Sequence, residues 1–348
     1  MEKRLLKQVA GIDVAQKELV VSLGNMNEET TKVIYAYKVF PNNGKGFTAL
    51  LSWVEKQTDA VSPLKYVMEA TGVYHEALAY FLAGRGCQVS IVMPNKITNF
   101  FRTLEVKTVT DKSMSAAIAL FGLSMKLEDW TPPQAAFREL RQLTRERDQL
   151  IAERTMLKNQ LHAEQTEAYP SKNIISRMQE RIKMINTQLK KGLDEITAVI
   201  KSDEQINRSV KLITSIPGIG LLTAAVIIAE TNGFELIRSK KQLTSYAGLD
   251  VKEKQSGTSV KGKPRISKRG NRYLRKAMYM PALAAIRHSE RYKAIFVRIV
   301  TRNGIKMKAA VAVQRKLLEM AYTLCKNKTP FESDYLQIQR EKEMALNS

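Results

Sequence analysis

Apolar and polar positions in the first third of the chain predict strands and helices in turn. Short alternating or continuous apolar runs bounded by turn residues are typical of strands, whereas apolar positions repeating at helical spacing are typical of helices. The predicted strands cover 8–15, 18–24, 31–40, 65–70 and 88–93, and the predicted helices cover 47–57 and 74–86. Because the first two strands form a hairpin and the others alternate with helices, residues 7–125 are predicted to be an α/β unit around a mixed sheet.

The pattern changes after Pro132 and Pro133, where a long charged stretch with a seven-residue apolar repeat begins. Residues 167–173 interrupt this stretch. A heptad repeat with a central break predicts two helices that fold back as an antiparallel coiled-coil hairpin. Such a hairpin serves as a spacer or oligomer contact, or it binds a partner. The repeat consists of Leu143, Leu150 and Leu157, with Leu140 and Leu161 beside it, and of Ile174, Met178, Ile182, Ile185 and Leu189.

A compact apolar region begins near Lys211 and contains the pentapeptide IPGIG at 216–220. Two apolar helical stretches flank it, which is the spacing of a helix-hairpin-helix turn. Glycines let backbone amides and a following helix N-terminus approach a phosphate, so Pro217, Gly218 and Gly220 are predicted nucleic-acid contacts. A plain turn between two core helices would give the same pattern.

A basic run lies well inside the chain, between Val251 and Met278. It holds ten Lys and Arg against a single acid, Glu253, and three serines lie among them: Ser256, Ser259 and Ser267. Apolar helical sequence on both sides argues against a disordered tail. A surface of one charge sign within a globular chain is instead predicted to bind an anion.

Composition narrows the class of partner. The chain has 348 residues, 44% of them hydrophobic, and a net charge of +22, which predicts a globular protein of several domains. An isoelectric point near 9.9 predicts attraction to polyanions, foremost nucleic acid, with a ribosome-like or membrane-surface protein as the alternative. No signal region or membrane-length apolar run is present in the sequence, so we expect no membrane partner and a cytoplasmic protein, nucleoid-associated in a bacterium when bound to DNA.

Few residues could hold a soft metal. Cys87 and Cys325 lie far apart in apolar sequence, and His75, His162 and His288 do not recur at ligand spacing. A disulfide framework and a thiolate zinc site are therefore not supported, and any metal must be held by oxygen.

Three acids are candidates for such an oxygen site. Asp13 lies in an apolar strand, Glu69 ends another apolar strand, and Asp111 opens a helical stretch. Carboxylates at one sheet edge suit Mg²⁺, which commonly takes a few carboxylates together with water and phosphate oxygens. Each acid also has an ordinary explanation, as a turn cap, a solvated rim residue or a helix cap.

The residues now in view resemble those of the IS110 (IS116/IS902) family of insertion-sequence transposases, in order and spacing, from about residue 7 to 330. The resemblance implies a RuvC-like (RNase H-fold) domain with a DEDD acid set, an α-helical coiled-coil linker, and a mainly α transposase domain with a helix-hairpin-helix-like turn. On this chain those parts correspond to 1–131, 132–205 and 206–335, with a tail at 336–348. The matching segments are GIDVAQKELVVSL, VMEATGVYHEALAYFL, VKTVTDKSMSAAIALFG, IPGIGLLTAAVIIAET, LTSYAGLD and QSGTSVKGKPRISKRGNRYLRKAM.

The resemblance also implies a DNA recombinase that uses Mg²⁺, pairs a structured guide RNA with donor and target DNA, and acts as a homo-oligomer, a dimer or tetramer. Its first three acids correspond to Asp13, Glu69 and Asp111. The fourth departs from the family pattern, because Met114 stands where an Asp is usual.

Three explanations for the missing acid stay open. An oxygen of Ser115 or Ser113 completes the ligand set, another acid such as Glu105 substitutes, or metal binding is weakened. Three carboxylates with water can still hold the ion.

The family nucleophile is a serine that corresponds to Ser256, with Ser259 and Ser267 as competing candidates. A serine hydroxyl needs an activating partner or metal, and the resemblance implies that Ser256 attacks a phosphate polarised by Mg²⁺ on the acids, in a composite site. The surrounding bases then contact phosphates, with Arg favoured for bidentate capture. These bases are Lys261, Lys263, Arg265, Lys268, Arg269, Arg272 and Arg275.

Two other functions compete with a serine recombinase. A junction-resolving nuclease would use the same acids to activate water and would form no covalent intermediate. A non-enzymatic packaging protein would use only the basic surface, and it predicts no metal-dependent strand cleavage.

Overall fold

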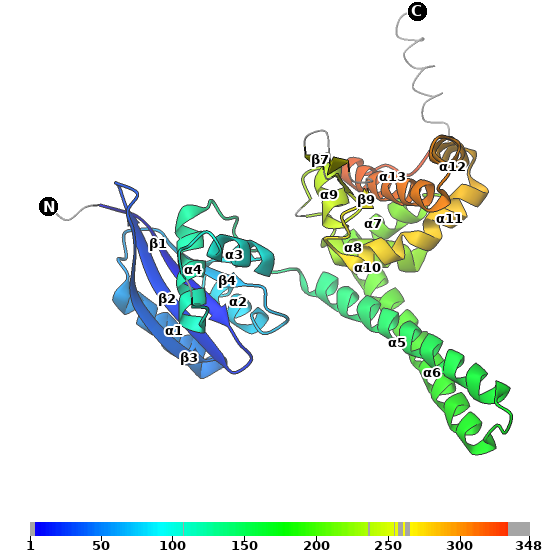
Figure 1. Ribbon diagram of the computed structural model, residues 1–348, viewed down its shortest axis with the longest axis horizontal. Coiled ribbons are helices and arrows are strands. Elements are labelled where there is room, and N and C mark those ends of the chain that lie inside the picture. Colours follow the sequence, from blue (N-terminus) through cyan, green and yellow to red (C-terminus); the bar gives the residue numbers. More distant parts are fainter. Residues whose placement is uncertain are drawn as a thin grey trace, which may run out of the picture. The chain divides into compact units, whose positions relative to one another are not determined.

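A mixed five-stranded sheet forms the centre of the first part of the chain (Figure 1). The computed structural model describes residues 4–106, 108–235, 237–253, 255–256, 260–261 and 265–332. The strands are β1 (Leu5–Val14), β2 (Glu18–Asn27), β3 (Lys32–Pro41), β4 (Leu64–Glu69) and β5 (Gln88–Val92), in the order β3-β2-β1-β4-β5. The first three strands pair antiparallel, and β4 and β5 continue the sheet parallel to β1. The predicted mixed α/β sheet is confirmed.

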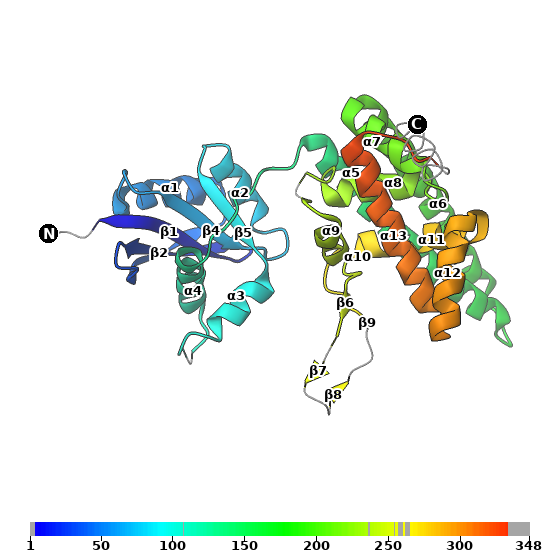
Figure 2. The same cartoon turned by 90° about the horizontal axis from the view of Figure 1, so that it is seen from above.

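Helices cover both faces of this sheet (Figure 2). Side chains of a strand point to opposite faces in turn, so Ile12 of β1 enters one core and Val9 the other. The Ile12 side packs against the first two helices, and the Val9 side packs against the other two. The helices are α1 (Gly44–Gln57), α2 (Glu76–Ala83), α3 (Pro94–Phe101) and α4 (Asp111–Ser124).

Helix α4 lies unusually close to β1 because Gly11 has no side chain. A Cβ built at Gly11 would fall 2.3 Å from the backbone nitrogen of Ala119 and 2.5 Å from the carbonyl oxygen of Ser115. Gly122, one helical turn beyond Ala119, sits in the same way against the side chains of Val9 and Val67. These contacts fix the position of α4 along β1, and with it the position of Asp111, the first residue of α4.

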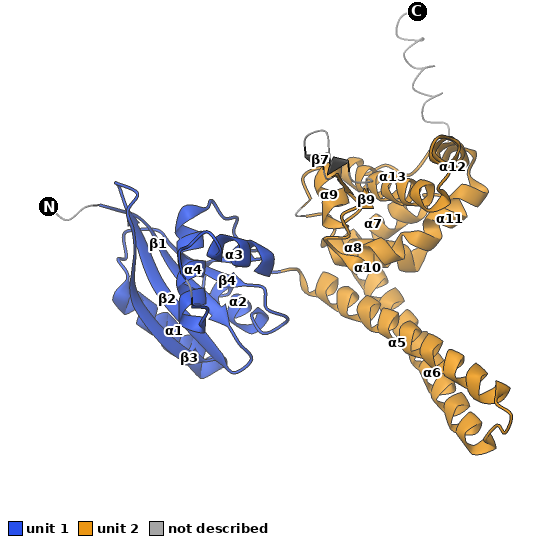
Figure 3. Cartoon of the chain, in the orientation of Figure 1, with its two compact units in different colours: residues 1–132 blue, residues 133–348 orange. Residues whose placement is uncertain are grey.

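The chain divides into two compact units, Met1–Pro132 and Pro133–Ser348 (Figure 3). The second unit is mainly helical and begins with two long helices joined by residues 167–171, in agreement with the predicted helical hairpin. The helices are α5 (Ala135–Thr166), α6 (Lys172–Ser202), α7 (Glu204–Thr214), α8 (Leu221–Thr231), α9 (Lys240–Tyr246), α10 (Arg272–Ala277), α11 (Tyr279–His288), α12 (Glu290–Asn303) and α13 (Lys306–Asn327). Two short ribbons, β6 (Val251–Lys252) with β9 (Arg265–Ile266) and β7 (Gln255–Ser256) with β8 (Val260–Lys261), separate α9 from α10.

The root of the hairpin belongs to the core of the second unit. Phe137 and Leu140 of α5 and Ile196 and Ile200 of α6 are buried in the same cluster as α7, α8, α10, α11 and α13. The predicted boundary at residue 205 therefore falls inside a continuous hydrophobic core. Because its root is packed in this way, the hairpin is held at one end by the helices that follow it.

The turn at 216–220 joins α7 and α8, and its glycines differ in environment. Gly218 has φ +89°, and a Cβ there would lie 2.7 Å from the Pro281 carbonyl oxygen and 2.9 Å from the Ala285 nitrogen, both in α11. The space beside Gly218 is thus filled by protein, and helix packing explains this glycine. Gly220 caps α8 with nothing within 4 Å of its Cβ position, so the space beside this glycine is open.

Replacing Gly218 by Ala is expected to destabilise the second unit by roughly 2–4 kcal/mol, through a disfavoured backbone conformation and overpacking against α11. Gly220→Ala, at φ −92°, is the matched control and should cost less than about 1 kcal/mol. Urea unfolding of the full chain measures both. Equal stability of the two variants would contradict the packing role of Gly218.

Across the part of the chain that the structure describes, no helix combines the length and apolar character that crossing a membrane requires.

Candidate functional site

The two strand acids lie at the ends of neighbouring parallel strands, Asp13 next to last in β1 and Glu69 last in β4. Residue pairing between β1 and β4 runs to Ile12 opposite Met68, so Asp13 and Glu69 are each the next residue on their strands. Asp111 begins α4, whose N-terminus is capped by Thr110, with the Thr110 hydroxyl accepting from the backbone NH of Ser113 at 3.2 Å. The sheet and this cap together bring the three predicted acids to one edge of the first unit.

The acids repel one another. Burial, and then the charge of Asp111, raise the pKa of Asp13 above its ordinary value. Burial, and then the charge of Asp13, raise the pKa of Glu69. Among the described residues no ion pair connects any of the three carboxylates to a cation. Uncompensated carboxylates with raised pKa values are typical of functional sites, because a structural role would favour a partner of opposite charge.

This arrangement fits an open divalent site better than a closed cage. Within the described ranges no three His, Cys, Asp or Glu side chains stand close enough to enclose a metal ion. Mg²⁺ commonly binds through one or two carboxylates and fills its other positions with water and substrate phosphate. Asp13 and Glu69, with Asp111 nearby, have the donor chemistry and the unrelieved negative charge for such a site.

The structure gives Ser115, the fourth predicted metal ligand, hydrogen-bond partners within the protein. Its side chain is fully buried under α4, where its hydroxyl lies 2.8 Å from that of Ser22 and donates to the Lys112 carbonyl oxygen at 2.9 Å. Close packing of α4 on β1 turns Ser115 toward the sheet, and its role as a metal ligand stays a prediction. Met114, in place of the fourth family acid, packs against the apolar core on the α4 side.

The basic ribbon region, which is the run 251–278 with the ribbons β6–β9 and β7–β8, contains the predicted nucleophile. Ser256 lies in β7, opposite Val260 in β8. For Ser256 and Lys261 the structure describes the strands and not the side chains, and Ser259 and Lys263 lie outside the described residues. The role of Ser256 therefore remains a prediction.

Ser267, the third candidate nucleophile, has a structural partner. Its hydroxyl donates to the Asp250 carboxylate at 2.5 Å, and its backbone NH donates to the Asp250 carbonyl oxygen at 2.8 Å. Both bonds close the base of the β6–β9 ribbon. This geometry explains Ser267 without a catalytic role.

The predicted phosphate contacts differ in how exposed their side chains are. Arg265, Lys268, Arg269 and Arg272 are exposed. Arg275 is half-buried and donates to the Ala247 carbonyl oxygen at 2.8 Å, so it holds α10 against the end of α9.

Glu230, a buried acid that holds side chains of two other helices, was not predicted from the sequence. It is buried at the end of α8 and accepts two hydrogen bonds from Arg145 of α5, at 2.7 and 2.9 Å. Asn271, which caps α10, donates to the same carboxylate at 2.6 Å. An acid within an apolar run was the signal used for Asp13, and the run ending in Glu230 carries the same signal.

Replacing Arg269 and Arg272 together by Ala is expected to flatten the salt dependence of duplex DNA binding. Each phosphate neutralised contributes a slope of about −0.9 to log affinity against log salt, so the slope should fall by up to about two units. Arg298→Ala with Arg302→Ala, an exposed pair on α12, removes the same charge and should leave the slope unchanged. A flattened slope only in this second pair would place the DNA surface on α12.

Family models and curated relatives match this chain over both units. Residues 10–170 match the transposase model of the IS110 DEDD type, and residues 210–296 match the model of the transposase IS116/IS110/IS902 family. The acids fall in the first match and the basic ribbon region in the second.

The pilin gene-inverting protein of Moraxella bovis is 31% identical over 300 residues, covering 84% of this chain and 89% of that protein. The transposase for insertion sequence element IS1111A of Coxiella burnetii is 31% identical over 137 residues, 38% of this chain and 35% of that protein. The Thermus thermophilus RuvC structure aligns with a TM-score of 0.28 and 12% identity, over 35% of this chain and 99% of RuvC. The long match to the gene-inverting protein and the two family models together place this chain in the IS116/IS110/IS902 family, as a DNA transposase.

Proposed function

We propose that this transposase exchanges DNA strands through a covalent serine intermediate, with Ser256 as nucleophile and Asp13, Glu69 and Asp111 as the acid site. The observation that carries the proposal is the like-charge cluster at the ends of β1 and β4 and the start of α4. Burial, and then the charge of a neighbouring acid, raise the pKa values of Asp13 and Glu69. A second observation supports it: Ser256 lies in a ribbon whose neighbours include exposed cations suited to phosphates.

The acids would hold a divalent cation, Mg²⁺ by the chemistry of the donors. When bound, this ion would polarise the scissile phosphate and offset the charge that develops on it. Among the residues of this chain, Asp13 and Glu69 would bind the cation and orient it, and Asp111 would add negative charge to the site. Because the pKa values of Asp13 and Glu69 are raised, cation binding is expected to displace protons from them as pH falls toward the carboxylate range.

Ser256 would form a phosphoserine ester that conserves the energy of the broken phosphodiester. Its Oγ forms a bond to phosphorus while the bond between phosphorus and the deoxyribose oxygen breaks. The serine proton passes to water, and the leaving oxygen takes up a proton. Rejoining is the reverse, with a hydroxyl of the other strand displacing the serine, so one ester replaces another at each step and no external energy source is needed.

The partners belong to the same proposal: donor and target DNA, a structured guide RNA, and further copies of this chain in a dimer or tetramer. The net charge of +22 supports nucleic-acid partners in general. DNA inversion, the activity named for the Moraxella relative, also requires cutting and rejoining of strands.

Strand exchange between two plasmids, with and without Mg²⁺ and with the element's own RNA, tests the proposal. Exchange that requires the metal, and leaves DNA attached to protein on denaturation, is the expected result. Cleavage without attachment would favour a nuclease in which the same raised-pKa acids activate water. Binding with neither cleavage nor exchange would oppose both.

A further inference from the structure

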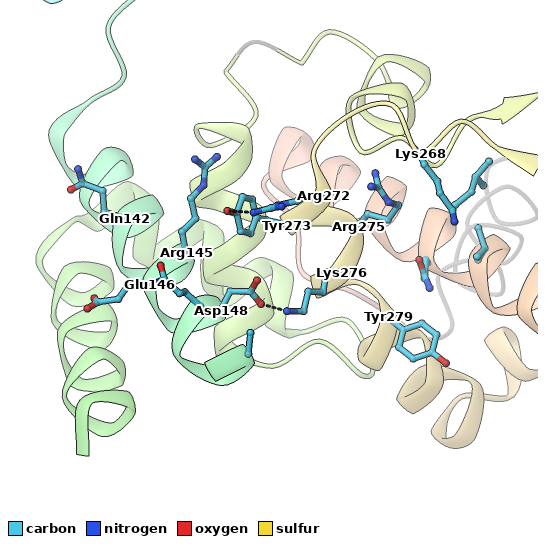
Figure 4. A pocket seen from close by; sticks show the side chains of 15 residues that line it. Gln142, Arg145, Glu146, Asp148, Lys268, Arg272, Tyr273, Arg275, Lys276 and Tyr279 are labelled. Carbon is cyan, nitrogen blue, oxygen red and sulfur yellow. Dashed lines mark hydrogen bonds and ion pairs between the residues drawn. The ribbon is translucent and has the colours of Figure 1, made fainter. Parts of the chain in front are cut away.

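A groove of about 1040 Å³ lies at the root of the hairpin, within the second unit (Figure 4). One wall is α5, the other runs from the end of β9 through α10 to the start of α11, and α13 adds Val311 and Gln314. Five Lys and Arg side chains line it against two acids, Glu146 and Asp148. Tyr273 and Tyr279 line it as well, so the groove combines an excess of positive charge with aromatic rings.

Hydrogen bonds and ion pairs order the cations of this groove. Glu230 holds the guanidinium of Arg145 through two oxygens, and the same guanidinium lies 4.7 Å from the centre of the Tyr273 ring. Lys276 pairs with Asp148 at 2.5 Å. Because the Arg145 side chain is held on two sides, it keeps one orientation along the wall without a ligand, which lowers the entropy lost on binding.

We propose that this groove binds a single strand of DNA, through its phosphates and by stacking of a base on Tyr279, and that Glu230 is the positioning residue of the site. Positive grooves with exposed aromatic rings are the surfaces that hold unpaired nucleic acid, since every unpaired base offers a ring face that a duplex conceals. Tyr279 remains 37% exposed in the groove, which leaves its ring open to a base. The inference rests on the proposed function, because strand exchange produces unpaired DNA beside the cut.

The role of Glu230 can be separated from simple electrostatics by the sign of its effect. Removing a negative charge near a polyanion site should strengthen binding if charge alone matters. Glu230→Gln should instead weaken binding, because it releases the Arg145 guanidinium and loosens Asn271. The Asn271 side chain accepts from the backbone NH of Leu274 at 2.9 Å and so starts α10. Glu146→Gln, which neutralises an exposed acid on the α5 wall, is the matched control and should strengthen binding.

Fluorescence anisotropy of the full-length protein, without divalent metal, provides the test. The probes are a labelled single-stranded DNA of mixed sequence, the same sequence as a duplex, and the same sequence as RNA. Tyr279→Ala should lower single-strand DNA affinity by at least about fivefold and duplex affinity by much less, because a stacked base is lost. Tyr169→Ala, 93% exposed at the turn of the hairpin, should change neither affinity.

Each outcome is decisive. Wild-type single-strand affinity in Tyr279→Ala, or an equal loss on duplex, overturns the groove as a single-strand site, and preference for the RNA probe overturns its assignment to DNA. Glu230→Gln with unchanged or tighter binding and an unchanged thermal melt overturns positioning. If Glu230→Gln unfolds, Arg145→Lys keeps the charge but cannot span both Glu230 oxygens, and it should weaken binding in its place. Since this assay needs neither metal nor Ser256, failure here leaves the strand-exchange result independent.

Discussion

Replacing Asp13 by Asn is expected to abolish metal-dependent strand exchange while leaving the first unit folded and DNA binding intact. The change keeps the volume of the side chain and removes a full ligand charge. Changes to residues that only support a metal ligand already cost about 10- to 100-fold, so loss of a ligand charge should cost more than about 100-fold. Glu69→Gln should behave in the same way. Recombination between two plasmids, read as the fraction of joined product, measures both variants.

The control is Glu18→Gln, which neutralises an exposed acid at the start of β2 and should exchange strands normally. Wild-type exchange in both Asp13→Asn and Glu69→Gln would mean that these acids are structural. Loss of exchange in Glu18→Gln as well would mean that overall charge, and not the acid site, is responsible.

A stability measurement separates loss of function from loss of fold. Burial and the charge of Asp111 raise the pKa of Asp13, so the folded chain binds that proton more tightly than the unfolded chain. This group therefore favours folding below its unfolded pKa, and the contribution is lost as pH rises through the carboxylate range. At neutral pH Asp13→Asn removes the penalty and should melt no lower than the parent. At about pH 3, where the parent carboxylate is also protonated, the advantage should disappear.

The sheet could be predicted from sequence because its strands are regular in pattern. Val9 and Ile12 enter different cores, and the predicted strand at 8–15 falls within one residue of the end of β1. Helix α3 could not be predicted in the same way. It has eight residues and buries only Ile97 and Phe101, too few apolar positions to establish a helical period.

The three acids could be singled out from the sequence for a related reason. A carboxylate in an apolar strand is costly unless it serves a purpose, and neighbouring strand ends meet at one edge. The orientation of Ser115 could not be predicted in this way, because it depends on how closely α4 approaches the sheet. That approach is set by Gly11 on a distant strand, whose missing side chain admits the Ala119 backbone.

The groove at the root of the hairpin could not be predicted from the sequence. Arg145 and Glu230 are separated by 85 positions, and neither has a local motif. Their pairing depends on α5 packing across α8, which the heptad pattern of α5 alone does not indicate. The same tertiary contacts give Arg275 a carbonyl partner and leave Arg269 exposed, although both belong to one basic run. Charge patterning thus predicted a nucleic-acid surface as a region, while the environment of each cation required the fold.

Ser256 is expected to become covalently joined to DNA, because a recombinase that rejoins strands without an external energy source must conserve the broken phosphodiester as an ester. Incubation with labelled substrate, the element's RNA and Mg²⁺, followed by denaturation, should leave label migrating with protein. Mass spectrometry of the labelled peptide should map the adduct to Ser256. Ser256→Ala should bind DNA normally but form no covalent adduct, so the label that migrates with protein should fall to background.

The neighbouring serines are the matched controls for this adduct. Ser259→Ala should trap as the parent does. Ser267→Ala loses the hydroxyl bond to Asp250 at the base of the ribbon, so it should trap with lower stability of the second unit but at the same residue. An adduct on Ser259 or Ser267 would move the nucleophile and keep the mechanism. Efficient metal-dependent cleavage with no adduct in any variant would remove the covalent intermediate, and the acids at the ends of β1 and β4 would then act by activating water.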